Sequence, residues 1–122
     1  IGNMYFSDHG AGLLDWQVVR RGQGMRDISY FLVSSLPIET RLAHQEDLIK
    51  LYLDHLRGDG ITAPDFQQAW EQYRLHTFYT WIAQIVTAAA GTLQQERIVR
   101  TGLSRTAQAI VDLDSLEALR AM

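Results

Sequence analysis

The residues with the clearest chemical potential are Asn3 and Asp15, which flank a stretch with the pattern of a β-hairpin. Residues 4–6 and 12–14 are short apolar runs, and residues 7–11 between them are turn-forming types. Because antiparallel strands bring such flanking positions to one end of a hairpin, we expect Asn3 and Asp15 to be spatial neighbours. An amide oxygen and a carboxylate held together are ligands that Mg²⁺ prefers. On spacing alone, a turn or capping role is the alternative interpretation.

The order of these motifs resembles the second half of the catalytic core of the aminoglycoside phosphotransferase and choline kinase-like family, in its ecdysteroid kinase-like branch. Gly2 and Asn3 match the end of the family's catalytic loop, and Asp15-Trp16-Gln17 matches its metal-binding Asp motif, the counterpart of Asp-Phe-Gly in protein kinases. The resemblance implies that Asn3 and Asp15 bind Mg²⁺ and, through it, the cofactor ATP or GTP. It also implies the C-terminal lobe of a protein kinase-like fold, with the N-terminal lobe absent.

Asp27, in the segment "RDISYFL", matches a third position of the same family. The resemblance implies that its carboxylate accepts hydrogen bonds from the backbone of the catalytic loop and supports the shape of that loop. The alternative interpretation is a negative charge in the first turn of a helix, where it interacts favourably with the helix dipole by up to about 1 kcal/mol. The specific motifs cover residues 2–34, and from there to about residue 90 the resemblance is one of pattern only.

The family's catalytic Asp lies five positions before the motif Asn, which would place it upstream of Ile1. The nucleotide-binding lobe of the family is expected upstream as well. We therefore expect the C-terminal portion of a kinase-like phosphotransferase, with no catalytic base among these residues. The resemblance implies transfer of the γ-phosphate of a nucleotide to a hydroxyl of a small molecule. An inactive pseudokinase remains an open interpretation, because the position of the base is not in the sequence.

Composition excludes several classes of protein. The chain of 122 residues is 47% hydrophobic, 20% charged and carries a net charge of −3, which is typical of one globular domain. The basic residues are spread along the chain apart from the cluster of Arg20, Arg21 and Arg26, so we expect no nucleic-acid partner. The longest apolar run, residues 81–91, is too short to span a bilayer, so no membrane association is expected. The absence of cysteine agrees with a reducing compartment, and we expect a cytoplasmic protein.

The sequence predicts a mainly α protein with a short N-terminal β-hairpin, organised as a single domain. Residues 1–17 contain the end of the catalytic loop, the hairpin and the metal-binding Asp motif, and residues 18–122 form a helical subdomain. Apolar periodicity and breakers predict helices over residues 27–36, 42–57, 66–90, 94–111 and 115–122. The third of these is expected as one helix or as two joined near Arg74.

Local signals mark the ends of these helices. Pro37 is expected to stop one helix or to open the next. Thr62 with Asp65 three residues later resembles a capping box, and Gly91 is expected to end the long helix. Asp112 or Asp114 is expected to cap the last helix. The side chains expected to face inward from the two longest later helices are Trp70, Tyr73, Phe78, Trp81, Ile82, Ile85, Val86, Ile98, Leu103, Ala107 and Ile110.

Trp70, Tyr73 and His76 are candidates for the wall of an acceptor pocket, because later helices of the family often line it. Helical spacing makes the hydrophobic core the default interpretation of the aromatic residues. A different class of function also remains open, a non-catalytic helical module that binds a partner protein.

We further expect exposed apolar side chains on the hairpin where a missing lobe would have packed, and self-association through that surface. The expected patch comprises Met4, Phe6, Leu13 and Trp16.

The 122-residue chain alone is expected to catalyse no phosphoryl transfer. Positioning and electrostatic stabilisation supply nearly all the catalysis in this reaction, and the catalytic Asp and the nucleotide-binding lobe that provide much of both are expected upstream of Ile1. The measurement is nucleotide hydrolysis and phosphorylation of a broad set of hydroxyl compounds in the presence of Mg²⁺. An active small-molecule kinase in the same assay is the control. Robust Mg²⁺-dependent turnover by the chain would contradict the expectation.

Overall fold

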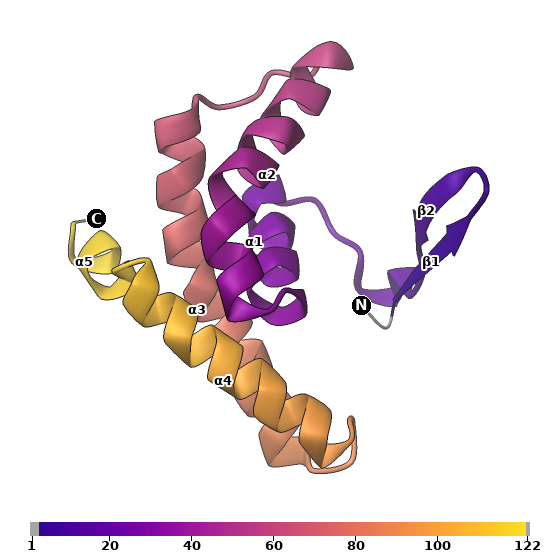
Figure 1. The fold of residues 1–122 in the computed structure, drawn as a ribbon, viewed down its shortest axis with the longest axis vertical. Coiled ribbons are helices and arrows are strands. Elements are labelled where there is room, and N and C mark those ends of the chain that lie inside the picture. Colours follow the sequence, from indigo (N-terminus) through magenta and orange to yellow (C-terminus); the bar gives the residue numbers. More distant parts are fainter. Residues whose placement is uncertain (1–2, 122) are drawn as a thin grey trace.

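The computed structural model describes residues 3–121 and consists of a small hairpin followed by a body of helices (Figure 1). Gly2, part of the family motif, lies outside the described residues. The predicted class, mainly α with an N-terminal hairpin, is confirmed. The elements in chain order are β1 (Met4–Ser7), β2 (Gly10–Leu13), the 3-10 turn η1 (Trp16–Val18), α1 (Gly24–Ser35), α2 (Ile38–Gly58), α3 (Phe66–Ala90), α4 (Glu96–Asp112) and α5 (Ser115–Arg120).

The two strands of the hairpin are antiparallel, with Met4 opposite Leu13 and Phe6 opposite Ala11. Since side chains alternate across a strand, these four apolar residues share one face of the sheet. The opposite face carries Tyr5, whose ring lies over Gly12 and leaves no room for a side chain there. The turn is tighter than the sequence predicted. The hairpin is therefore apolar on one side.

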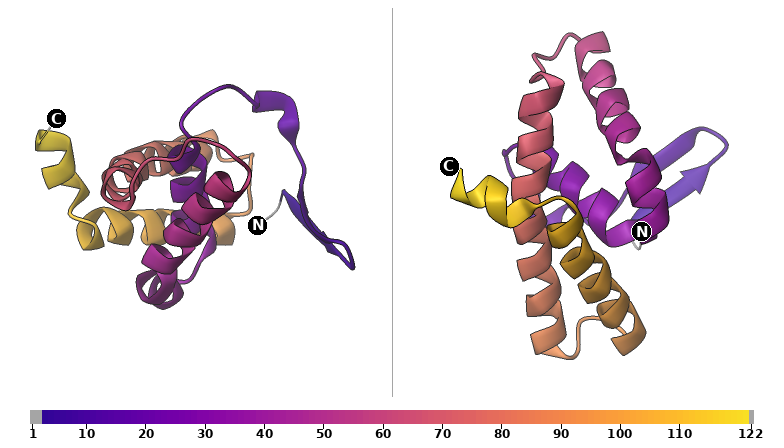
Figure 2. Two further views of the ribbon diagram at one scale, coloured as in Figure 1. Left: turned by 90° about the horizontal axis from the view of Figure 1, so that it is seen from above. Right: turned by 60° about the vertical axis from the view of Figure 1, so that its left-hand side comes forward.

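The hairpin stands to one side of the helices and is joined to them by η1 and residues 19–23 (Figures 1 and 2). Its apolar side chains are open to solvent: Phe6 is 72% exposed, Trp16 58% and Leu13 54%, whereas Met4 is partly covered. The expected exposure is thus confirmed for Phe6, Leu13 and Trp16.

Pro37 separates the first two helices. α1 ends at Ser35, and Pro37 is the N-cap residue of α2 with an extended backbone (φ −54°, ψ 149°). Proline lacks the N–H that would continue α1, and its fixed φ suits the entry to the next helix. α1 begins at Gly24, three residues before the predicted start at Asp27.

The start of α3 differs from the sequence prediction. The N-cap is Asp65, not Thr62: the Gln68 N–H donates to the Asp65 carboxylate at 2.8 Å, and the Asp65 N–H donates to the Gln68 amide oxygen at 3.2 Å. This reciprocal pair is a capping box shifted by three residues. From there α3 is one continuous helix to Ala90, and Gly91 ends it in the left-handed conformation (φ 68°).

α3 is the central helix and packs against α1, α2, α4 and α5 (Figure 2). Its buried stripe is Ala69, Tyr73, Thr77 and Thr80. The threonines tolerate burial because their hydroxyls are hydrogen-bonded; that of Thr77 is 2.8 Å from the Ser115 hydroxyl. The buried hydrophobic residues of the whole body are Met25, Leu32, Val33, Ile49, Leu53, Ala69, Tyr73, Ala109, Leu113 and Ala118.

Several side chains that were predicted to face inward from α3 and α4 are exposed instead. Ile82, Ile85 and Val86 are 59%, 43% and 58% exposed, because the C-terminal end of α3 extends beyond most of the helical body and lies beside α4 (Figure 1). Ile98 and Ala107 on α4 are exposed as well; Gly102, Thr106 and Ala109 face inward instead.

The longest apolar run of the sequence, residues 81–91, forms the end of α3 and its C-cap residue. Across residues 3–121, no helix combines the length and the apolar character that crossing a bilayer requires.

A buried polar network joins α2, α3 and α4. Arg41 of α2 is 1% exposed, and its guanidinium forms an ion pair with Asp112 at the end of α4 and donates to the Gln45 amide oxygen at 2.9 Å. The same oxygen accepts from the Tyr73 hydroxyl at 2.9 Å. Burial raises the pKa of Tyr73 to about 12, against a smaller lowering effect of Arg41. The hydroxyl therefore stays a donor to Gln45 at neutral pH.

Asp112→Ala is expected to lower the free energy of unfolding by about 3 kcal/mol, because it leaves the buried Arg41 charge without its carboxylate partner. Urea unfolding measures the change. The control is Glu96→Ala, which removes an exposed pair with Arg100 and should cost at most about 0.5 kcal/mol.

The double variant Arg41→Met/Asp112→Leu should recover much of the loss, since both charges are then gone. Equal losses in Asp112→Ala and Glu96→Ala would contradict the structural role of this pair.

Candidate functional site

Asn3 and Asp15 lie together at the open end of the hairpin. The Leu14 N–H donates to the Asn3 carbonyl at 2.8 Å and extends the strand pairing by one step. The Asn3 side-chain amide then donates to the Asp15 carboxylate at 2.9 Å. The expectation that these residues are neighbours, twelve positions apart in sequence, is confirmed. Their role as metal ligands stays a prediction.

The backbone at Asp15 turns sharply out of the hairpin. Asp15 has φ 67° and ψ 56°, in the left-handed region that aspartate and asparagine adopt more readily than other residues with a side chain. The Trp16 indole N–H donates to the Leu13 carbonyl at 3.1 Å, across the turn. This local geometry keeps the Asp15 carboxylate beside Asn3 and open to solvent.

The pair fits a metal site with two protein ligands, completed by phosphate and water, and not a site made of protein ligands alone. The Asn3 amide engages Asp15 through its nitrogen, so its oxygen, the atom that would bind a metal, is not used by that hydrogen bond. Within the described residues, no group of three or more His, Cys, Asp or Glu could hold a metal ion. Mg²⁺ is commonly bound by one or two protein oxygens, with phosphate oxygens and water completing its octahedron. Asn3 and Asp15 suit that arrangement.

Asp27 lies in the first turn of α1, where negative charge is favourable. Its carboxylate is 3.3 Å from the Arg26 guanidinium, and its side chain is 75% exposed. Its position in a first turn was expected, whereas support of a catalytic loop stays a prediction.

The three candidates for the acceptor pocket lie in different environments. Tyr73 is fully buried in the core, and the Trp70 ring packs between Phe66 and Tyr73, with centroids 5.9 and 5.4 Å apart. His76, one turn further along α3, lines a mainly apolar cavity of about 560 Å³ between α3, α5 and the residue preceding α1. The cavity is lined by Gln23, Gln72, Leu75, His76, Phe78, Ile82 and Leu119.

His76 anchors the start of α1. Its Nε2 lies 2.9 Å from the Gln23 amide oxygen, and the Arg26 guanidinium lies over the Tyr79 ring at 5.2 Å. Burial, followed by the nearby Arg26 charge, lowers the pKa of His76 against an opposing effect of Asp27. Sequence reasoning missed Gln23, because its partner is 53 positions away and glutamine in a glycine-containing loop carries no signal of its own. These contacts fix where the segment from the hairpin meets the helices.

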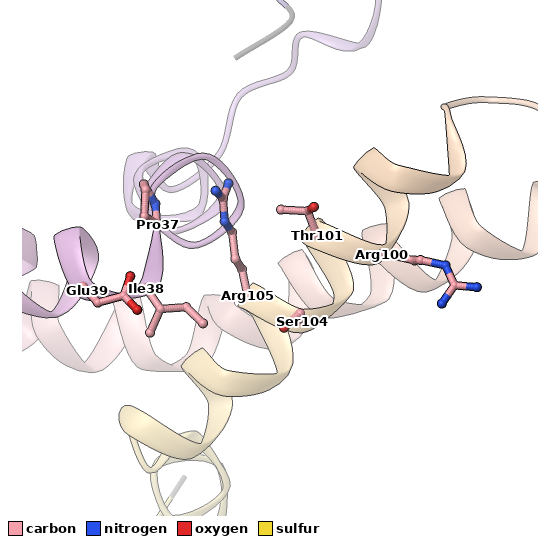
Figure 3. A pocket seen from close by; sticks show the side chains of 7 residues that line it. All are labelled: Pro37, Ile38, Glu39, Arg100, Thr101, Ser104 and Arg105. Carbon is pink, nitrogen blue, oxygen red and sulfur yellow. The ribbon is translucent and has the colours of Figure 1, made fainter.

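A second, smaller cavity of about 430 Å³ lies between the start of α2 and one face of α4 (Figure 3). Its two arginines are already engaged. Arg105 donates to the carbonyls of Ser34 and Ser35 at the end of α1, at 3.0 and 3.1 Å. The Arg100 guanidinium points away from the cavity (Figure 3) and is paired with Glu96. Among the residues that line it, this cavity therefore offers no free positive charge to a ligand.

Comparison with known proteins finds a similarity over one part of the chain. Residues 3–59 match the model of the Ecdysteroid kinase-like family, a range that includes Asn3, Asp15 and Asp27 and runs to the end of α2. A search of curated proteins found no match, and a search of solved structures found none either. The resemblance inferred from the motifs is thus confirmed over this range.

The free energy of unfolding is expected to fall as the pH decreases from about 7 to about 5, with His76 as one source. Because the pKa of His76 is lowered in the folded protein, the unfolded chain binds this proton more readily, and acid favours unfolding. Urea unfolding at a series of pH values measures the slope. His76→Gln should flatten it. The same slope in His76→Gln and the parent would contradict this assignment.

Proposed function

We propose, on the premise that residues 3–59 match the model of the Ecdysteroid kinase-like family, that the chain carries the metal-binding residues of a kinase-like phosphotransferase. The reaction proposed is transfer of the γ-phosphate of ATP or GTP to a hydroxyl of a small molecule. Asn3 and Asp15 are the proposed ligands of Mg²⁺, and Asp27 is the proposed support of the catalytic loop.

The observation that carries the proposal is the hydrogen bond between Asn3 and Asp15 at the open end of the hairpin. Two oxygen-bearing side chains from opposite ends of the motif meet there, on the part of the chain that matches the family. Both are exposed, so phosphate and water have access to them. In a capping role, the Asp15 carboxylate would accept a hydrogen bond from the backbone of η1, and no such bond is present. The carboxylate accepts from the Asn3 amide instead.

Each protein group has a defined task in this proposal. When bound, Mg²⁺ neutralises the charge that gathers on the phosphate oxygens during transfer. The Asp15 carboxylate supplies a negatively charged oxygen ligand, and Asn3 supplies a neutral one. Their mutual hydrogen bond limits the freedom of both side chains before any ligand arrives, so less ordering is needed on binding.

Asp15→Asn is expected to weaken binding of Mn²⁺, used as a spectroscopic substitute for Mg²⁺, by more than about ten-fold, since it removes the one charged ligand. The electron paramagnetic resonance signal of free Mn²⁺ measures binding, with and without ATP. Asp8→Asn, in the turn of the same hairpin, is the matched control and should bind like the parent.

Retained strand-to-strand contacts in NMR spectra of both variants would show that the hairpin is intact. Equal affinities of Asp15→Asn and the parent for Mn²⁺ in the presence of ATP would contradict the proposed metal site.

A further inference from the structure

Most basic side chains of this protein are neutralised within the fold. Seven of them pair with a carboxylate, and Arg105 donates to backbone carbonyls; the seven are Arg26, Arg41, Lys50, Arg57, Arg74, Arg100 and Arg120. The three other arginines, Arg20, Arg21 and Arg97, make no side-chain hydrogen bond or ion pair with any residue that the structure describes. Arg20 and Arg21 are adjacent, so their charges are concentrated at one place in the chain.

That place is the segment between the hairpin and α1. Arg20 lies five residues after Asp15, and η1 occupies three of the intervening positions. From the rise of a 3-10 helix and of an extended chain, the Cα atoms of Asp15 and Arg20 are at most about 15 Å apart. Both arginines are exposed, and an arginine side chain can cover much of this distance. Their guanidinium groups are thus within reach of a ligand seated at Asn3 and Asp15.

Two adjacent guanidinium groups without a counter-charge favour an anion that carries several charges. Arginine binds phosphate oxygens through paired hydrogen bonds in a fixed geometry, which suits it better than lysine to this task. The protein carries a net charge of −3, so it does not attract anions as a whole. Binding of an anion would depend on a local concentration of positive charge such as this pair. The arginines of the cavity between α2 and α4 are already engaged, so that cavity does not compete as an anion site.

We propose that Arg20 and Arg21 bind the oxygens of a polyphosphate chain whose metal ion is held by Asn3 and Asp15. The ligand class is a phosphoanhydride complexed with a divalent cation, such as a nucleoside triphosphate. A chain of phosphate groups extends further from the metal ion than a single phosphate group does, and it offers more oxygens to the two arginines. The inference rests on the proposed function, because the metal ion brings the phosphate chain into reach of the arginines.

The test compares the double variant Arg20→Gln/Arg21→Gln with Arg97→Gln, which removes the third unpaired arginine at an exposed site in the first turn of α4. Isothermal titration measures binding of Mn²⁺ alone, Mn²⁺ with tripolyphosphate, Mn²⁺ with orthophosphate, and tripolyphosphate without metal.

The double variant should bind Mn²⁺ alone like the parent and Mn²⁺ with tripolyphosphate about ten-fold more weakly, the loss expected when charge-assisted contacts are removed. Its binding of tripolyphosphate should also depend less on salt. Arg97→Gln should match the parent in every titration. With Mn²⁺ and orthophosphate, the affinities of the double variant and the parent should differ much less than with Mn²⁺ and tripolyphosphate.

Equal affinities of the double variant and the parent for Mn²⁺ with tripolyphosphate would overturn the inference and leave a solvated loop. An equal loss in Arg97→Gln would also overturn it, because the effect would then reflect overall charge. If the parent binds no Mn²⁺ with or without tripolyphosphate, the proposed function fails, and the inference that rests on it fails too. If the parent binds Mn²⁺ and the double variant keeps the parent's affinity for Mn²⁺ with tripolyphosphate, only the role of the arginines is overturned.

Discussion

The helical body depends on the satisfaction of one buried charge. The Arg41 guanidinium lies where α2, α3 and α4 meet, and it is accommodated only because Asp112 and Gln45 face it, with Tyr73 hydrogen-bonded to Gln45. An ion pair of this kind adds little net stability relative to apolar residues, but each partner becomes costly to remove once the others are in place. The three helices are thereby fixed relative to one another. α3 in turn provides the surface on which α1 and α5 pack.

The proposed site depends on a different constraint, the register of two four-residue strands. Strand pairing brings Asn3 opposite the start of the Asp15 turn without any contribution from the helical core. The helices act on the site only through the point where the chain leaves it. Gln23 against His76 and Arg26 over Tyr79 fix that point at the beginning of α1. The chemistry is thus carried by a small, exposed unit, and the larger unit sets its attachment.

The sequence predicted what depends on local signals. Turn residues in the hairpin were enough to bring Asn3 and Asp15 together, and Pro37 and Gly91 marked true helix ends. The buried face of α3 was predicted only in part from hydrophobicity. Tyr73 is buried as expected, but burial there also follows hydrogen-bonded threonines such as Thr80, whereas Ile82 is exposed. Contacts such as that of Gln23 with His76 depend on the packing of distant segments, which apolar periodicity does not encode.

The separation of the hairpin from the helical body bears on cooperativity. Two parts joined by one segment need not unfold in a single transition, and a short hairpin without a covered face is marginally stable by itself. A ligand bound at Asn3 and Asp15 would stabilise the folded hairpin by mass action, yet little of that free energy would reach α2, α3 and α4. Thermal unfolding followed by the helical signal would then not detect such a ligand. The fluorescence of Trp16, which lies next to the hairpin, could detect it.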